Sequence, residues 1–395
     1  MKAIILAAGK STRTYPLTIN KPKALLPILD KTIIEHTLSL LKGTIDEIVI
    51  IVGFKKQMII DTLGEEYEGM KITYIEQKEQ LGTGHALTLA KDYIDEKFLV
   101  LCGDDIYDKK DIKRLLGHDN AALVKNVDDP RVFGVYKANK NKALGIIEKP
   151  KEDVGNLANI GCYIFSPEIF DYLENLKKTE RGEIEVTCAI NELCKKRDFI
   201  LETIKGTWIP ITYPWNLLEA NVHFLRQMKE SKIEGDVEDG ATIKGNVFVG
   251  EGTKVMAGAY IQGPVYIGKN CEVYPGAYLR PDSILLDGCR VRSEVYDSLL
   301  MKGVSSKHDS YLGHSIIGEN CNIGAGTITS DYRADGKNHI TIVNGKKIDS
   351  TRRKLGAFLG DNVFTSIHTS IYPGRKLWSG VMTLPGEIVK KDKIE

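Results

Sequence analysis

Near the start of the chain, small residues and two cations have the spacing of a phosphate-binding loop. The segment Leu6-Ala7-Ala8-Gly9-Lys10-Ser11-Thr12-Arg13 is followed by Lys21-Pro22-Lys23. Small side chains let backbone N–H groups approach phosphate oxygens closely, and the Arg13 and Lys23 side chains can neutralise phosphate charge. The kinase-type P-loop is excluded, because Ile4 stands where that motif needs its first glycine.

A second group of chemically capable residues lies around His308. The stretch Ser306-Lys307-His308-Asp309-Ser310-Tyr311-Leu312-Gly313 precedes Asn322-Ile323-Gly324-Ala325-Gly326-Thr327. Histidine titrates near neutral pH, so it can remove the proton that keeps an amine from acting as a nucleophile. The alternative is that His308 is an ordinary surface residue at a turn.

A six-residue repeat predicts the element that positions His308. Every sixth residue is aliphatic over one long run: Val237, Ile243, Val249, Val255, Ile261, Ile267, Val273, Leu279, Leu285 and Val291. This period fits neither a helix nor a simple strand, but it fits coils with three flat sides, stacked about 4.8 Å apart. The phase is lost at Asp297, returns at Ile317 and reappears from Leu359 to Val389. The pattern predicts a hexapeptide β-helix, with an irregular surface near His308 where a groove can form.

The N-terminal part has a different pattern, in which apolar strands alternate with helices. Strands are expected at Ala3–Leu6, 48–52, 72–75 and 98–101, and helices at 33–41, near 57–63 and from Gly84. Continuous apolar strands separated by helices predict a mostly parallel, doubly wound α/β sheet of Rossmann type. Ligands of such sheets bind at the carboxyl ends of the strands, where the Leu6–Arg13 segment begins.

Length and composition bound the remaining possibilities. With 395 residues, two domains are expected, at 1–228 and 229–395. The net charge of +1 does not suggest binding to nucleic acid or membranes. Seven cysteines without a CxxC pair fit buried thiols in a reducing cytoplasm, and no apolar run is long enough to span a membrane. A cytoplasmic protein is therefore expected.

The N-terminal motifs resemble those of the sugar-1-phosphate nucleotidylyltransferases, whose signature reads L-A-A-G-x-G-T-R, then P-L-T, then P-K. The resemblance covers roughly residues 1–225. It implies nucleotide-binding residues at Leu6, Ala8, Gly9, Gln77, Gln80, Gly82 and Thr83. It also implies a Mg²⁺ ligand at Asp104 and sugar contacts at Gly134, Glu148, Lys149 and Asn159. Taken singly, Gln77 also fits a surface amide, Glu148 and Lys149 a solvated pair, and Asp104 a helix cap.

The implied reaction is attack of a sugar phosphate oxygen on the α-phosphorus of UTP or dTTP, with release of pyrophosphate. No protein nucleophile is needed, because the substrate phosphate is already an anion. By resemblance, Arg13 acts on the departing pyrophosphate, Lys23 on the reacting phosphates, and Asp104 holds Mg²⁺. Catalysis would then consist of positioning and charge stabilisation.

The segment around His308 resembles the acetyltransferase half of the bifunctional enzymes that make UDP-N-acetylglucosamine, with H-x-x-Y-x-G and N-I-G-A-G-T. In that family the histidine deprotonates the sugar amine, which attacks the thioester of acetyl-CoA. The resemblance implies His308 as base, with substrate contacts at Arg280, Tyr311, Asn322, Ala325, Asp331 and Lys337. It also implies a left-handed β-helix, a homotrimer and acetyl-CoA bound between neighbours. The basic residues 352–354 lie in an insert that resembles archaeal members, and they fit either coenzyme A phosphates or a solvated charge run.

Four residues depart from these family patterns. Ser11 stands where a glycine is usual, a mild change if its φ is negative. Pro210 stands where many relatives have an aspartate that binds a second metal, which leaves Asn216 or another oxygen as the substitute. Tyr296 replaces a lysine that binds the sugar phosphate. Asp331 replaces an asparagine, which exchanges a donor amide for an acceptor-only carboxylate.

The preferred interpretation is a bifunctional enzyme that couples a sugar 1-phosphate to UTP or dTTP and N-acetylates an amino-sugar 1-phosphate. The alternatives are a nucleotidylyltransferase with a structural or regulatory β-helix, a regulatory subunit without activity, and an acetyltransferase with an inert N-terminal lobe. The residues do not rank the sugar phosphates, nor do they separate UTP from dTTP.

Overall fold

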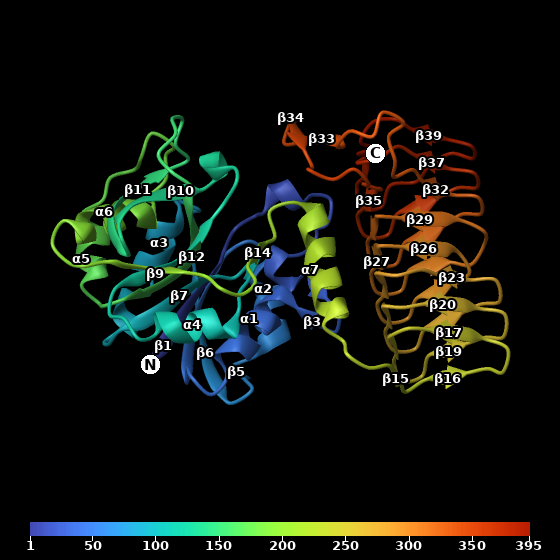
Figure 1. The fold of residues 1–395 in the computed structure, drawn as a ribbon, viewed down its shortest axis with the longest axis horizontal. Helices are drawn as coiled ribbons and strands as arrows, with labels where there is room; N and C mark the ends of the chain where they lie inside the picture. The colour runs from blue at the N-terminus through green and yellow to red at the C-terminus, as the bar shows by residue number, and fades with distance from the viewer. The chain divides into compact units, whose positions relative to one another are not determined.

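A computed structural model describes all 395 residues as two compact units (Figure 1). The α/β unit comprises Met1–Lys10, Pro22–Leu25 and Ile33–Pro210. The coil unit comprises Ser11–Lys21, Leu26–Thr32 and Ile211–Glu395. The boundaries of these units therefore differ from those of the expected domains, 1–228 and 229–395. No helix in the structure is both long and apolar enough to cross a membrane.

The α/β unit is built on a ten-stranded mixed sheet. Its strand order is β10 (Gly134–Asn139), β11 (Lys142–Glu148), β13 (Ile200–Thr203), β9 (Ala121–Asn126), β12 (Leu157–Phe165), β7 (Phe98–Cys102), β1 (Lys2–Ala7), β4 (Glu47–Val52), β6 (Met70–Glu76) and β5 (Glu66–Tyr67). The run β7-β1-β4-β6 is parallel, as expected for this part of the sequence, whereas β12 is antiparallel to both β7 and β9.

Helices cover both faces of this sheet because its central strands are apolar on both sides. In β1, Ile4 belongs to one hydrophobic cluster and Ile5 to the other. The helices are α1 (Ile33–Leu41), α2 (Lys56–Leu63), α3 (Thr83–Thr88), α4 (Lys109–Leu115), α5 (Ile169–Glu174) and α6 (Val186–Cys194). Short 3₁₀ turns occur at η2 (Lys23–Leu25), η3 (Lys91–Tyr93) and η4 (Pro130–Val132), and β8 (Asp105–Ile106) pairs with β14 (Ile209–Pro210). The doubly wound fold is confirmed.

The coil unit consists of three parallel sheets that form the sides of a stacked prism (Figure 1). Side one is β15 (Lys232–Ile233), β18 (Val247–Val249), β21 (Val265–Ile267), β24 (Ser283–Leu285), β27 (Ser298–Leu300), β30 (Ile316–Ile317), β35 (Phe358–Leu359) and β38 (Lys376–Leu377). Side two is β16 (Asp236–Val237), β19 (Lys254–Val255), β22 (Glu272–Val273), β25 (Arg290–Val291), β28 (Ser305–Ser306), β31 (Asn322–Ile323) and β36 (Phe364–Thr365). Side three is β17 (Thr242–Lys244), β20 (Tyr260–Gln262), β23 (Tyr278–Leu279), β26 (Glu294–Tyr296), β29 (Tyr311–Gly313), β32 (Ile328–Thr329), β37 (Ser370–Ile371) and β39 (Ile388–Val389).

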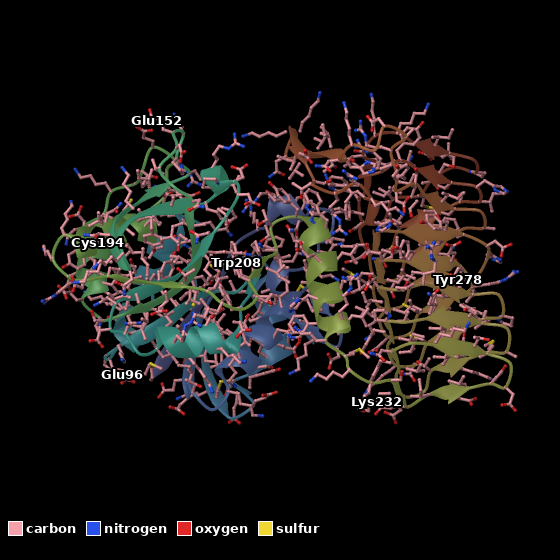
Figure 2. The ribbon with its side chains drawn as sticks, viewed as in Figure 1. Glu96, Glu152, Cys194, Trp208, Lys232 and Tyr278 are labelled. Carbon is pink, nitrogen blue, oxygen red and sulfur yellow. The ribbon has the colours of Figure 1, made fainter.

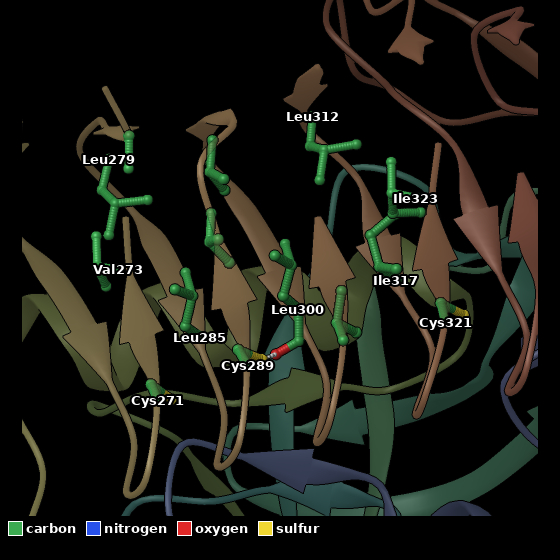
Figure 3. Packing of buried hydrophobic residues seen from close by; sticks show 14 of the residues in the cluster. Cys271, Val273, Leu279, Leu285, Cys289, Leu300, Leu312, Ile317, Cys321 and Ile323 are labelled. Atoms are coloured by element: carbon green, nitrogen blue, oxygen red, sulfur yellow. Dashed lines mark hydrogen bonds between the residues drawn. The ribbon is translucent and has the colours of Figure 1, made fainter. Parts of the chain in front are cut away.

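The inward residues of the repeat form one continuous core, so the left-handed β-helix is confirmed. Val273, Leu279, Leu285 and their equivalents are fully buried (Figure 3). Cys271, Cys289 and Cys321 line the same interior as buried thiols, and the Cys289 Sγ lies 3.8 Å from the Leu300 carbonyl oxygen (Figure 3).

The lost phase after Val291 is a set of shortened coils rather than a break in the prism. Val255 pairs with Val273, eighteen residues on, whereas Val291 pairs with Ser306, only fifteen residues on. The inward position at Ser306 is polar, and its hydroxyl is hydrogen-bonded to that of Ser293. The ladder of parallel strands stays continuous through this region.

The coil unit carries three elements outside its coils. The insert between β32 and β35 folds as the hairpin β33 (Ile340–Val343) and β34 (Lys346–Asp349). Helix α7 (Pro214–Arg226) packs against β27 and β30. The segment with the 3₁₀ turn η1 (Thr12–Thr14) also belongs here, as does the small ladder β2 (Pro27–Ile28)–β3 (Lys31–Thr32).

Lysine 21 connects this N-terminal segment to the coils. Its buried ammonium contacts the Glu319 carboxylate and lies 3.4 Å from Asp361 Oδ2. The segment that includes Arg13 is therefore fastened to the coil unit by a buried ion pair.

Candidate active sites

The carboxyl ends of β1, β4 and β7 lie side by side in the α/β unit. Leu6 pairs with Cys102 on one side and with Ile51 on the other. The backbone is closely packed here, since a Cβ placed on Gly53 would lie 2.7 Å from the Ala8 carbonyl oxygen. Ala8 and Gly9 follow β1 directly, so small residues leave this edge of the sheet open to a ligand.

Lys23 and Asp104 form an ion pair at this edge. The Lys23 side chain is 9% exposed, whereas that of Asp104 is 37% exposed. The family resemblance implies that Lys23 acts on the reacting phosphates and that Asp104 holds Mg²⁺, and the structure brings these two side chains together. In the absence of substrate, each charge is balanced by the other.

Asp104 has no cluster of further metal ligands around it. The structure contains no group of three or more His, Cys, Asp or Glu side chains that could hold an ion. Mg²⁺ often binds through one or two carboxylates and completes its coordination with substrate phosphates and water. The partly exposed Asp104 carboxylate fits an ion of that kind, held jointly with a triphosphate.

Pro210 lies in strand β14, which pairs with β8 in a small two-stranded ladder. Pro210 pairs with Asp105. The indole Nε1 of Trp208, a residue labelled in Figure 2, donates a 3.0 Å hydrogen bond to Asp105 Oδ2. The Asn216 Oδ1 accepts a hydrogen bond from the Tyr213 backbone N–H and caps α7. Asp105, which the sequence analysis did not single out, is the carboxylate opposite Pro210.

Residues assigned to the nucleotide base are held in place by hydrogen bonds. The Gln77 Nε2 donates to the Gly82 carbonyl at 3.1 Å and lies 3.0 Å from His85 Nδ1. This leaves the Gln77 Oε1 available as an acceptor for an N–H group such as that of a pyrimidine. The Gln80 Nε2 donates to the Ala8 carbonyl at 3.0 Å, which connects this segment to the loop after β1.

Thr83, at the start of α3, contacts the start of α6. Its Oγ1 accepts a 3.3 Å hydrogen bond from the Val186 backbone N–H. Gly82 leaves no room for a side chain, because a Cβ there would lie 2.5 Å from the Ile184 carbonyl oxygen. The segment assigned to the base is therefore packed against the start of α6.

Two of the residues assigned to the sugar face each other across a pair of strands. Gly134 pairs with Glu148, and a Cβ at Gly134 would lie 2.9 Å from a Glu148 carboxylate oxygen. Glu148 also accepts a 3.2 Å hydrogen bond from Arg181, which in turn pairs with Glu185 at 2.8 Å. Burial raises the pKa of Glu185. Arg181 lies in the loop between α5 and α6, and no sequence motif marks it as a neighbour of Glu148.

The other two sugar candidates have local partners. The Asn159 Nδ2 donates a 2.7 Å hydrogen bond to the Tyr163 hydroxyl. Lys149 has a left-handed φ of 45°, and its ammonium lies 3.8 Å from Glu148. The alternative interpretation, in which Glu148 and Lys149 form a solvated pair, does not include the hydrogen bond between Arg181 and Glu148.

Arg13 belongs to the coil unit and is exposed in η1. The residue before this turn, Ser11, has a φ of 52°, so the expectation of a mild replacement at negative φ is not met. A left-handed conformation is the one that glycine adopts without strain. The Ser11 carbonyl accepts hydrogen bonds from the hydroxyls of Thr14 and Thr18, which stabilise the turn.

The acetyltransferase candidates are distributed over neighbouring coils. His308 and Ala325 lie in the same corner of successive coils, where the Gly326 N–H donates to the Asp309 carbonyl at 2.7 Å. Asn322 lies on side two, paired with Ser305. Lys337 lies in the insert.

Hydrogen bonds bring Tyr311 and Asp331 together on side three. The Tyr311 hydroxyl donates to Asp331 Oδ2 at 2.9 Å. Burial, and then this bond to a carboxylate, raises the pKa of Tyr311. Tyr311 therefore remains a hydrogen-bond donor at neutral pH.

Arg280 is held between aromatic rings and a carboxylate. Its Cζ lies 4.0 Å from the centre of the Tyr296 ring, and Nη1 lies 2.8 Å from Glu294. The Lys354 ammonium lies 5.5 Å from the same Tyr296 ring. The tyrosine that replaces a lysine is thus flanked by two cations. The sequence pattern does not identify Glu294 as a neighbour of Arg280, because the six-residue repeat does not predict the shortened coil that brings them together.

In contrast, the side chains of His308, Asn322 and Lys337 form no hydrogen bond or ion pair within the chain. His308 and Lys337 are exposed. These polar groups are free to meet a ligand.

Family models match both units of the chain. Residues 2–227 match the nucleotidyl transferase family, and residues 261–371 match the family model described as the GMPPB C-terminal domain.

Similar proteins extend over the whole chain. The bifunctional protein GlmU of Methanococcus vannielii is 42% identical over 99% of this chain and 95% of its own length. That of Methanococcus maripaludis strain S2 is 44% identical over the same shares. A bifunctional sugar-1-phosphate nucleotidylyltransferase/acetyltransferase of Sulfurisphaera tokodaii is 39% identical, over 99% of this chain and 98% of that protein.

Among solved structures, a putative glucose-1-phosphate thymidylyltransferase from Bacillus anthracis matches with 32% identity and a TM-score of 0.53. It covers 59% of this chain and 98% of its own. A UDP-glucose pyrophosphorylase complexed with UDP-glucose matches with 25% identity and the same TM-score, over 57% of this chain and 98% of that one.

Proposed function

Because the chain belongs to the archaeal GlmU-type family of bifunctional sugar-1-phosphate nucleotidylyltransferases/acetyltransferases, we propose that each of its units carries one of two reactions. The α/β unit couples a sugar 1-phosphate to UTP or dTTP. The β-helix N-acetylates an amino-sugar 1-phosphate of the glucosamine type with acetyl-CoA. The observation that carries this proposal is identity of 42–44% over 99% of the chain, which includes both units.

In the first reaction, an oxygen of the sugar phosphate forms a bond to the α-phosphorus of the nucleoside triphosphate. The bond from that phosphorus to the β-phosphate breaks, and pyrophosphate leaves. Lys23 exchanges the Asp104 carboxylate for substrate phosphate oxygens, and Arg13 neutralises the leaving group. Asp104 would hold Mg²⁺, which supplies charge neutralisation on the phosphates when bound.

Base and sugar are positioned by the remaining residues of the α/β unit. Leu6, Ala8 and Gly9 provide backbone close to the nucleotide, and the free Oε1 of Gln77 accepts the pyrimidine N3–H. Gln80, Gly82 and Thr83 hold that segment in place. Gly134, Glu148, Lys149 and Asn159 bind the sugar.

In the second reaction, His308 takes a proton from the sugar ammonium. The amine nitrogen then attacks the thioester carbonyl carbon of acetyl-CoA, the carbon–sulfur bond breaks, and coenzyme A leaves as a thiol. Arg280 binds the sugar phosphate, while Tyr311, Asn322, Ala325, Asp331 and Lys337 contact the substrates. The exposure of His308 and its lack of a partner support its role as the base.

The coils assemble as a homotrimer in this proposal. Large apolar side chains are exposed on the last coils, including Met382 at 62% and Leu384 at 71%. Such side chains gain stability when a neighbouring copy covers them.

A substrate panel tests the two-site proposal. Glucose, glucosamine, galactosamine and N-acetylglucosamine 1-phosphates are incubated with UTP, dTTP or acetyl-CoA, and pyrophosphate and free thiol are measured separately. We expect pyrophosphate with a pyrimidine triphosphate and thiol with an amino-sugar phosphate. Pyrophosphate without thiol for every amino sugar would favour a structural β-helix, and neither product would favour a regulatory subunit.

A further inference from the structure

His314 lies just beyond β29 and is buried, with 6% of its surface exposed. It has no part in the reactions described above. Its φ of 49° is left-handed, as are those of Asp297 and His368 elsewhere on the coils. The residue is held there by its surroundings on the coil.

Two carboxylates face the two nitrogens of this imidazole. The His314 Nδ1 lies 2.6 Å from Asp297 Oδ2, and Nε2 lies 3.3 Å from Asp331 Oδ2. The contact of Nδ1 with Asp297 is a hydrogen bond. The contact of Nε2 with Asp331 has an ion-pair distance but no hydrogen-bond geometry, and Nε2 has no other partner. Ionised carboxylates only accept hydrogen bonds, so both nitrogens face acceptors. An imidazolium at this position puts a positive charge beside both carboxylates.

Other charged and titratable groups surround His314 and its two carboxylates, including Arg226 on α7, which interacts electrostatically with Asp297. Arg352 lies 3.4 Å from Asp297 Oδ2, and the Tyr311 hydroxyl donates to Asp331. The Tyr296 ring stands edge-on to the imidazole at 4.9 Å, with Arg280 on that ring. His339 donates through Nε2 to the Asp331 carbonyl oxygen at 3.0 Å, not to its carboxylate. Lys354 lies 5.5 Å from the Tyr296 ring.

Of these groups, only the Tyr311 hydroxyl and the His314 ring contact the Asp331 carboxylate. The carboxylate is 11% exposed, so water compensates its charge poorly. Without a cation beside it, this carboxylate would present an uncompensated negative charge to the amino sugar.

We propose that His314 is a positioning residue of the acetyltransferase site, which as an imidazolium bridges Asp297 and Asp331. It fixes the orientation of the Asp331–Tyr311 pair and compensates the charge of Asp331. The amino-sugar phosphate then meets a hydrogen-bonded pair whose geometry is set before binding. This inference rests on the proposed acetyl transfer, and it adds a residue that does not touch the substrate.

The experiment compares three variants of the full-length protein with the wild type. They are His314→Asn, Asp331→Asn and the double variant, and coenzyme A release is measured with glucosamine 1-phosphate and acetyl-CoA. Asparagine at 314 tolerates the left-handed backbone, so the coil is retained. Pyrophosphate release and the melting temperature are followed in parallel, and His223→Asn, on α7, controls for loss of a histidine.

In His314→Asn we expect the KM for glucosamine 1-phosphate to rise about tenfold, with kcat changed less than about threefold. Adding Asp331→Asn should return KM to within about threefold of the wild type, because a neutral amide needs no cation. A merely structural role would not produce this rescue.

Three results would overturn the inference. They are an unchanged KM in His314→Asn, effects of the two substitutions that simply add, or a lowered melting temperature without rescue. If the wild type releases pyrophosphate but no coenzyme A with any amino-sugar phosphate, the proposed acetyl transfer itself fails. If His314→Asn does not fold, ¹⁵N shifts of the labelled wild-type histidines decide, since a neutral His314 tautomer at neutral pH contradicts the bridge.

Discussion

The two candidate sites hold their charged groups in opposite ways. In the α/β unit, Lys23 pairs with Asp104, and Glu148 pairs with Arg181. In the β-helix, His308 and Lys337 have no partner within the chain. The charges of Lys23 and Glu148 are therefore balanced within the chain before substrate binds, whereas the side chains of His308 and Lys337 are left open.

The difference follows from the folds. Parallel strands end at one edge of a sheet, so loops from several strands converge there and their side chains can contact one another. Residues on a β-helix project from stacked coils, so their contacts form mainly between neighbouring coils. Tyr311 and Asp331 meet in this way, whereas His308 lies at a corner. A site on coils needs either residues of a neighbouring coil or a ligand to balance its charges.

A large effect is expected from loss of the Lys23–Asp104 pair. Lys23→Met should lower pyrophosphate release by about 10³-fold, because stabilisation of the reacting phosphates is lost. Coenzyme A release should stay within about twofold of the wild type, since the two sites are separate. Both products are measured on one preparation, and a parallel fall in coenzyme A release would mean that the sites are not independent.

Removing the proposed base tests the opposite site. His308→Ala should lower coenzyme A release by about 10²- to 10⁴-fold, the usual contribution of a positioned base, and leave pyrophosphate release intact. The matched control is Lys302→Ala, which truncates an exposed side chain on the same coils. Equal loss in both variants would contradict the role of His308.

The stability of the coils depends on inward rather than outward aliphatic residues. Leu312→Ala, at a fully buried position, should lower the free energy of unfolding of the coils by about 3 kcal/mol. Leu384→Ala, at a position 71% exposed, should change it by less than about 0.5 kcal/mol in the monomer. Denaturant unfolding measures both, and equal effects would refute the assignment of the core.

Acid should weaken the insert of the coil unit before it weakens the α/β sheet. Burial lowers the pKa of His339 below its ordinary value of 6.5. The unfolded state then binds a proton that the folded state resists, so the stability contributed here falls as pH drops through 6.5 and below. Hydrogen exchange of the 339–350 backbone at successive pH values measures this, with His339→Gln expected to remove the dependence.

The smallest effect is expected at the turn that carries Arg13. Ser11→Gly should raise the free energy of unfolding by about 0.5–1 kcal/mol, because glycine adopts a positive φ without strain. Pyrophosphate release should change little. A loss of stability would show that the Ser11 side chain supports the turn.

Local patterns in the sequence were enough to predict both folds. Alternating apolar strands and helices predicted β1, α1, β4 and the strands beside them, because each element must bury its own face. The six-residue repeat predicted the coils for the same reason. The repeat located the change of phase at Asp297, but it could not show that the coils there are shortened, because the continuous strand pairing is seen only in the structure.

The contacts within the sites depended on tertiary structure. Arg181 approaches Glu148 from a loop 33 residues away, and no local pattern signals such an approach. The segment Ser11–Lys21 belongs to the coil unit, where Lys21 contacts Asp361 and Glu319, the latter 298 residues further along the sequence. His314 acquires its two carboxylates only when neighbouring coils stack.

Sequence by itself determined which elements form and which chemical groups are available, because periodicity and side-chain chemistry are properties of short segments. Tertiary structure alone decided which of those groups are paired, buried or free, because distances between segments are set by the packing of the whole unit. For this protein, that packing neutralises Lys23 with Asp104, leaves His308 exposed, and encloses His314 between Asp297 and Asp331.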